Sequence, residues 1–182
     1  MMSFFRLVML FAVLALPSAL HAELAVGTRA PQFTTQGALA GKEIPVDLRA
    51  ALRRGPVVLY FYPKAFTQGC TLETRAFAEA HDQFAAAGAT VIGMSADDLP
   101  TLRRFSTEAC RDKFAVAVAT PDIISAYDVH LRREGMPAGM ASRTSYVIAP
   151  NGHIAFVHSD LDYRDHVRLT LTAVESFKRA RK

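Results

Sequence analysis

Two cysteines, Cys70 and Cys110, are the residues of this chain best suited to covalent chemistry. Two thiols are too few for a disulfide scaffold, and the histidines show no zinc-ligand spacing with either of them. Cys70 lies in the stretch YFYPKAFTQGCTLETR, residues 60–75, after an apolar run and at the start of a helix-like segment. Its neighbours Gly69 and Thr71 are not core residues, so packing does not explain this thiol.

A thiol in the first turn of a helix faces unpaired backbone N–H groups and the positive end of the helix dipole. Both features favour the thiolate, which is the form that attacks electrophiles. Disulfide exchange through a C-x-x-C pair is disfavoured, because position 73 holds Glu73. Two possibilities remain open from the residues alone: a reactive Cys70, or a non-catalytic thioredoxin-like binding module with a structural Cys70–Cys110 disulfide.

Alternating strand-like and helix-like segments must position Cys70. Residues 56–62 and 89–96 are continuous apolar runs of the kind found in strands buried on both faces. Between them, apolar residues recur every four positions from Leu72 to Phe84, which predicts one helix that ends near Gly88. A strand, a helix and a second buried strand form a βαβ unit.

The rest of the chain continues this alternation. We predict a helix over 99–114, a short apolar run at 116–119, a short helix around 123–127, a hairpin at 145–158 that turns at Asn151–Gly152, and an amphipathic helix over 163–178. This order is typical of an α/β, thioredoxin-like fold, with a central mixed sheet and helices on both faces. Functional groups in such sheets gather beyond the carboxyl ends of the parallel strands, where Cys70 lies.

The first 22 residues have the pattern of a secretory signal peptide. Arg6 is followed by an apolar run from Leu7 to Leu16 and then by the small residue Ala22. The run is shorter than the roughly 20 residues that a membrane span needs. We therefore expect cleavage after Ala22, one domain over 23–182 and a periplasmic or secreted location; the alternative is an uncleaved N-terminal anchor.

Composition and charge exclude some function classes. The chain has 182 residues, of which 51% are hydrophobic and 21% charged, as in an ordinary globular protein. Without Arg6, 20 Lys and Arg residues face 17 Asp and Glu residues, a net charge of only +3. No aromatic residues interleave with the basic C-terminal segment KRARK, so we expect no nucleic-acid binding.

Pro63, Thr67 and Cys70 form a P-x-x-x-T-x-x-C arrangement within YFYPKAFTQGCT. This arrangement resembles the active-site signature of peroxiredoxins, and it is most similar to the bacterioferritin comigratory protein or peroxiredoxin Q branch. Glu73, the segment GMSADDLPTLRRF and the hairpin ASRTSYVIAPNGHI occur in the corresponding order. The resemblance covers roughly residues 25–178.

The resemblance implies a thiol-dependent peroxidase that reduces hydrogen peroxide or organic hydroperoxides. Cys70 would be the peroxidatic nucleophile and would become a sulfenic acid. Thr67 would place its hydroxyl beside the sulfur and the peroxide, and Arg143 would hold both by charge-assisted hydrogen bonds. Pro63 would end the strand and cover the sulfur from water.

The sequence departs from this branch at position 75, where many members have a resolving cysteine and this chain has Arg75. The resemblance then implies that Cys110, on the next predicted helix, resolves the sulfenic acid as an intramolecular disulfide. The alternative is a one-cysteine enzyme in which Cys110 only packs. We further expect a thioredoxin-like or other thiol reductant, a monomer, no cofactor or metal, and no stable membrane insertion after signal cleavage.

Overall fold

The structure is a computed structural model that describes residues 23–180. The expected signal peptide, residues 1–22, lies outside the described residues, so both the signal and its cleavage point stay predictions. Within residues 23–180, no helix combines the length and the apolar character that crossing a bilayer requires.

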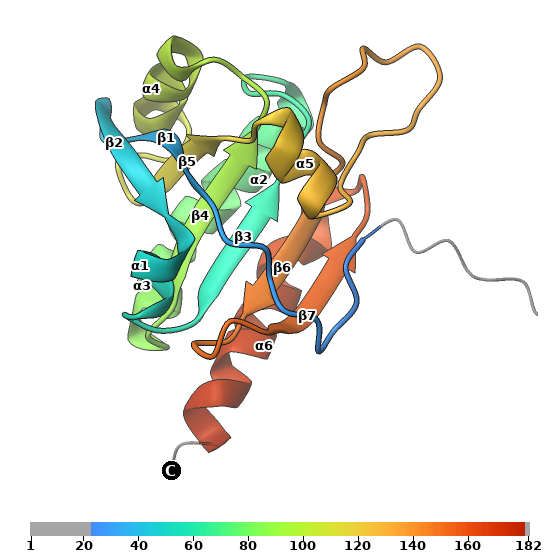
Figure 1. Cartoon of the computed structure of the whole chain (residues 1–182). Helices are drawn as coiled ribbons and strands as arrows, with labels where there is room; N and C mark the ends of the chain where they lie inside the picture. The colour runs from blue at the N-terminus through green and yellow to red at the C-terminus, as the bar shows by residue number, and fades with distance from the viewer. Residues whose placement is uncertain (1–22, 181–182) are drawn as a thin grey trace, which may run out of the picture.

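A seven-stranded mixed sheet forms the centre of the molecule (Figure 1). The strands follow the order β2-β1-β5-β4-β3-β6-β7 across the sheet. Their bounds are β1 (Thr34–Leu39), β2 (Lys42–Asp47), β3 (Val57–Phe61), β4 (Thr90–Ser95), β5 (Ala115–Val118), β6 (Thr144–Ile148) and β7 (Ile154–Ser159). Strands β3, β4 and β5 are parallel to one another, and the remaining pairs are antiparallel.

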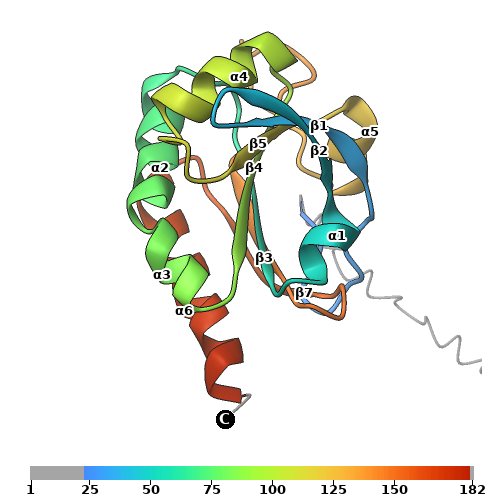
Figure 2. The same cartoon turned by 90° about the vertical axis from the view of Figure 1, so that its left-hand side faces the viewer.

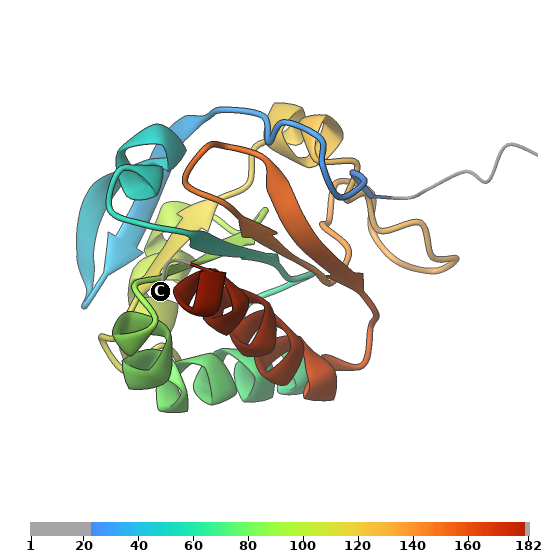
Figure 3. The same cartoon turned by 90° about the horizontal axis from the view of Figure 1, so that it is seen from below.

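Helices cover both faces of the sheet, which confirms the predicted architecture (Figure 2). One face packs against α1 (Leu48–Leu52) and α5 (Pro121–Ala126). The other packs against α2 (Gln68–Glu79), α3 (His81–Ala86), α4 (Leu99–Glu108) and α6 (His166–Ala180), the last preceded by the 3₁₀ turn η1 (Tyr163–Asp165). Figure 3 shows α6 running beside α2 and α3 under the sheet.

Strand β3 is buried on both faces because successive side chains point to opposite sides of a strand. Val57, Leu59 and Phe61 belong to the core beneath α1 and α5. Val58 and Tyr60 belong to the core beneath α2, α4 and α6. The continuous apolar run therefore fills two cores, as its sequence predicts.

The single helix predicted between β3 and β4 is wrong in one respect. Helix α2 ends at Glu79, and α3 begins at His81. Ala80 has a ψ of −2° and serves as the C-cap of α2 and the N-cap of α3, so one helix gives way to the next at this residue. The apolar stripe crosses this break, because Phe77 and Phe84 lie in the same core.

The helix predicted over 99–114 ends earlier, at Glu108. Arg111 and Asp112 adopt left-handed backbone conformations, with φ of 49° and 60°, that a right-handed helix cannot contain. Cys110 therefore lies in the turn after α4 and not on the helix. Its N–H group still donates to the carbonyl of Phe105, at 3.1 Å.

The N-terminal hairpin β1–β2 and the short helix α1 are absent from the sequence prediction. The two strands turn at Ala40 and Gly41, which have φ of 50° and 73°. Two consecutive positive φ values are the requirement of a tight two-residue hairpin turn. The C-terminal hairpin β6–β7 is confirmed around the predicted Asn151–Gly152 turn.

Candidate active site

The loop between β3 and α2 is fixed before the chain reaches Cys70. The Asp97 carboxylate, just after β4, accepts hydrogen bonds from the N–H group of Ala65 (2.7 Å) and the hydroxyl of Ser95 (2.8 Å). Phe66 has a φ of 63°, which is costly for a bulky residue, and its ring packs edge-on against Phe105 at 5.0 Å. The carboxyl ends of the parallel strands β3 and β4 thus hold this loop in place.

Cys70 lies in the first turn of α2, at the position that the sequence predicts. It is the third residue of the helix, after the N-cap residue Thr67, and only 1% of its surface is exposed. The thiol therefore lies at the end of the helix where the macrodipole is positive and N–H groups have no intrahelical acceptor. Helix N-termini of this kind are a common location of nucleophilic cysteines.

Arg143 reaches Cys70 from the position just before β6. Thr144, the first residue of β6, pairs with Phe61 at the end of β3, so Arg143 lies beside the loop that follows β3. Its Nη2 atom is 3.4 Å from the Cys70 sulfur, and its Nε donates to the carbonyl of Leu161 at 2.9 Å. The side chain is buried, so its charge acts on the sulfur with little screening by water.

Gly69 allows this approach because it has no side chain. A Cβ atom at this position would lie 3.2 Å from Arg143 Nη2. We expect Gly69→Ala to displace the guanidinium by a few tenths of an ångström and to slow the reaction of the Cys70 thiolate with an electrophile about tenfold. Alkylation and peroxide-reaction rates of the reduced protein would measure this. Unchanged rates would mean that the Arg143–Cys70 contact is not needed.

Glu73 lies one helical turn after Cys70 and forms an ion pair with Arg143 Nη1. The Glu73 side chain is completely buried. Burial raises the pKa of Glu73 to about 8, although the nearby Arg143 guanidinium lowers it. Burial lowers the pKa of Arg143 too, but Glu73 and Cys70 outweigh it and hold that pKa above its ordinary value.

His166, the first residue of α6, extends this buried cluster. Its Nδ1 atom lies 2.8 Å from the hydroxyl oxygen of Ser145 and 3.7 Å from Glu73 Oε1. Its Nε2 atom lies 2.9 Å from the carbonyl oxygen of Asp160. Burial is the main cause that lowers the pKa of His166 to about 4, so the imidazole is neutral near pH 7.

Thr67 and Pro63 lie in the same loop, but neither has a described hydrogen bond to Cys70. The Thr67 hydroxyl donates to the carbonyl of Lys64 at 2.9 Å, and its oxygen remains able to accept. Thr67 is the N-cap residue of α2 by position, yet its side chain makes no capping hydrogen bond. Pro63 is half-buried and follows β3 by two residues.

Cys110 is completely buried and belongs to the same core cluster as Cys70. Both are free thiols in the structure. Burial, assisted by the negative charge of Asp112, raises the pKa of Cys110 well above its ordinary value. A thiol held in this way is a poor nucleophile until it reaches water.

Sequence reasoning missed two members of the cluster. Glu73 entered only as part of the family resemblance, although its spacing of three residues from Cys70 places both on one side of a helix. His166 was considered only as a zinc ligand. Nothing in its sequence neighbourhood indicates that α6 begins under the sheet beside Glu73.

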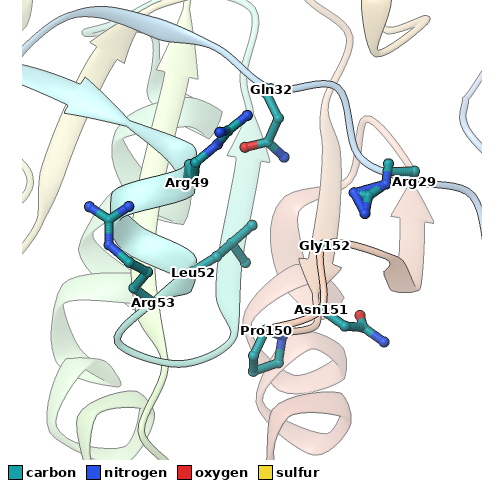
Figure 4. A pocket seen from close by; sticks show the side chains of 8 residues that line it. All are labelled: Arg29, Gln32, Arg49, Leu52, Arg53, Pro150, Asn151 and Gly152. Atoms are coloured by element: carbon teal, nitrogen blue, oxygen red, sulfur yellow. The ribbon is translucent and has the colours of Figure 1, made fainter.

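A surface cavity of about 370 Å³ lies away from this cluster. It is bounded by α1, by the N-terminal segment before β1 and by the turn between β6 and β7 (Figure 4). Its lining residues are Arg29, Gln32, Arg49, Leu52, Arg53, Pro150, Asn151 and Gly152. These elements lie at the amino end of β3, whereas Cys70 follows its carboxyl end, so the cavity is separate from the thiol site.

Comparisons with known proteins agree with this geometry. Residues 26–157 match the AhpC/TSA family model. The chain is 30% identical over 164 residues to peroxiredoxin Q, chloroplastic, of Gentiana triflora, covering 87% of this chain and 70% of that one. Peroxidoxin BcpB from Mycobacterium tuberculosis superposes with a TM-score of 0.73 at 26% identity, covering 83% and 96%. Peroxiredoxin Q from Xanthomonas campestris gives 0.66 at 26%, covering 78% and 89%.

The fold and these relatives define a thiol peroxidase, which is an oxidoreductase. The chain belongs to the AhpC/TSA family, and its relatives support the peroxiredoxin Q branch.

Proposed function

We propose that the Cys70 thiolate attacks one oxygen of hydrogen peroxide or an organic hydroperoxide. The O–O bond breaks, Cys70 becomes a sulfenic acid, and water or an alcohol leaves after protonation. The observation that carries this proposal is the 3.4 Å contact between Arg143 Nη2 and the Cys70 sulfur at the start of α2. A buried guanidinium beside a buried sulfur stabilises the thiolate and the charge that develops on the departing oxygen.

The neighbouring residues have supporting roles in this proposal. Thr67 donates its hydroxyl proton to the carbonyl of Lys64, and its hydroxyl oxygen accepts a hydrogen bond from the peroxide. Pro63 has no N–H group to compete for the thiolate, and it limits the access of water from the loop. Glu73 orients Arg143 through their ion pair.

Peroxide consumption by the reduced, purified protein tests the proposed function. With dithiothreitol or a thioredoxin as electron donor, we expect turnover of both hydrogen peroxide and an organic hydroperoxide. If the protein reduces neither peroxide and its Cys70 never oxidises, the proposal is wrong. A disulfide between Cys70 and Cys110 that forms without peroxide and never turns over would indicate the non-catalytic binding module.

We further propose that Cys110 resolves the Cys70 sulfenic acid as an intramolecular disulfide. The two cysteines share one core, and Arg75 removes the short-range alternative on α2. The buried Cys110 must become exposed before it can react, so the first turn of α2 and the turn after α4 have to open. Openings of this kind at helix ends cost little free energy.

For wild type, equimolar peroxide is expected to yield a Cys70–Cys110 disulfide, which mass spectrometry of the unreduced protein would detect. Cys110→Ser should keep the first oxidation of Cys70 fast but should raise the yield of sulfinic acid several-fold. Normal turnover of Cys110→Ser with an external thiol, without extra overoxidation, would identify a one-cysteine enzyme.

The compartment, reductant and assembly complete the proposal. We propose that residues 1–22 are a signal peptide, that residues 23–182 form the mature peroxiredoxin domain, and that it acts as a monomer in the periplasm or outside the cell. A thioredoxin-like protein or another thiol would supply the electrons.

A further inference from the structure

Glu73 and His166 form a buried pair in which one carboxylate oxygen lacks a hydrogen-bond donor within the described part of the chain. Glu73 Oε1 is buried and has no hydrogen-bond donor among the described residues. His166 Nδ1 lies 3.7 Å from it, which is beyond hydrogen-bond distance. A carbonyl oxygen only accepts, so the 2.9 Å contact with Asp160 requires the proton of the neutral imidazole to be on Nε2. His166 Nδ1 is then an acceptor as well.

Two acceptors that face each other in the core repel unless a proton lies between them. The hydroxyl of Ser145 cannot remove this conflict, because its one proton is directed at Nδ1 and leaves Oε1 without a donor. The side chains of Glu73 and His166 are both completely buried and therefore separated from bulk water. A buried acceptor without a donor is destabilising.

The charges of Cys70, Glu73 and Arg143 also require one more proton in this buried cluster. With a thiolate on Cys70, a carboxylate on Glu73 and the guanidinium of Arg143, the buried cluster would carry a net charge of −1. An uncompensated charge in the core is costly. One additional proton on Glu73 or His166 makes the cluster neutral while Cys70 stays ionised.

We propose that Glu73 is a protonated, neutral acid while Cys70 is a thiolate, and that the facing Nδ1 lone pair of His166 favours this state, which makes His166 a positioning residue of the peroxidase. The proton neutralises Glu73, so the positive charge of Arg143 acts mainly on the Cys70 thiolate. This inference rests on the proposed function, but the state of the pair can be measured independently of activity.

Every element around the pair contributes a group to this balance. The titratable and charged neighbours are Cys70 and Glu73 on α2, Tyr60 on β3, Arg143 before β6, His158 on β7 and Asp160 after β7. Tyr60 stays neutral because burial raises its pKa well above the ordinary value. The centroid of the His158 ring lies 4.5 Å from that of the His166 ring, and His158 is one of the groups that lower the pKa of His166.

The pair should lose its proton as the pH rises through about 8, the pKa of Glu73. The new carboxylate then competes with the thiolate for Arg143, so the rate constant for peroxide should fall about tenfold above that pH. Glu73→Gln, which is permanently neutral, should have no such decrease. His166→Leu removes the acceptor, disfavours the protonated acid and should shift the decrease to lower pH, whereas His166→Gln should restore it partly. His153→Gln, at an exposed histidine of the turn between β6 and β7, is the matched control and should keep the wild-type profile.

Nuclear magnetic resonance measures the protonation states of Glu73 and His166 directly in the reduced wild-type protein. At pH 7 we expect the ¹³C carboxyl shift of Glu73 to be that of a neutral acid and the ¹⁵N spectrum of His166 to report a proton on Nε2 alone. An ionised Glu73 would overturn the proposal. So would a wild-type decrease that persists in Glu73→Gln. If the protein does not reduce peroxide, the spectra still report whether Glu73 is protonated, so the two proposals are tested separately.

Discussion

Cys70→Ser is expected to lose peroxide consumption by several orders of magnitude while keeping the fold of the wild type. A serine hydroxyl is not ionised near pH 7, so the nucleophile is lost although the surroundings stay intact. The substitution is nearly isosteric, and the new hydroxyl can accept the hydrogen bond that Arg143 Nη2 now donates to sulfur. Stopped-flow measurement of peroxide loss, together with circular dichroism, checks both parts.

Cys110→Ser is the matched control for this experiment, because it removes the other buried thiol of the chain. Its first, single-turnover reaction with peroxide should remain close to that of the wild type. The account is contradicted if Cys70→Ser keeps a substantial fraction of the rate, or if Cys110→Ser is the variant that loses it.

Arg143→Ala should slow the reaction of the protein with peroxide by about 10² to 10³, the range found when one preorganised donor to a developing charge is removed. The rate of Arg143→Lys should lie between those of the wild type and Arg143→Ala. An ammonium group keeps the positive charge but cannot contact Cys70 and Glu73 together in the way that a planar guanidinium does. The second-order rate constant at fixed pH measures each effect.

Arg75→Ala is the control for charge alone. Arg75 is exposed on α2, five residues after Cys70, and has no ion pair among the described residues. Exposed charges contribute little, so its rate should change less than about twofold. Equal effects of Arg75→Ala and Arg143→Ala would mean that Arg143 contributes no more to the reaction than an exposed charge.

The sequence was sufficient for the central part of the fold. The apolar runs of β3 and β4 and the helix between them predicted the βαβ unit, because burial on both faces requires continuous apolar residues. The hairpin β1–β2 was missed, since its strands contain Gly37 and Pro45 and lack a strong alternation. The end of α4 was missed because Arg111 and Asp112 adopt left-handed conformations that their residue types do not require.

The candidate site was likewise predictable from the sequence only in part. The position of Cys70 followed from local pattern alone, whereas Arg143 required the family resemblance, because 73 residues separate it from Cys70. Strand pairing brings the two together, and register is a property of the whole sheet. The Glu73–His166 contact depends on how α6 packs beneath the sheet, which no local pattern encodes.

Trapping the first oxidation product tests the central claim most directly. Reduced wild-type protein would be treated with equimolar hydrogen peroxide in the presence of dimedone, which captures sulfenic acids, and its peptides would be mapped by mass spectrometry. We predict a dimedone adduct on Cys70, formed more slowly in Arg143→Ala than in wild type. An adduct confined to Cys110, or peroxide loss without any adduct or disulfide at Cys70, would contradict the account.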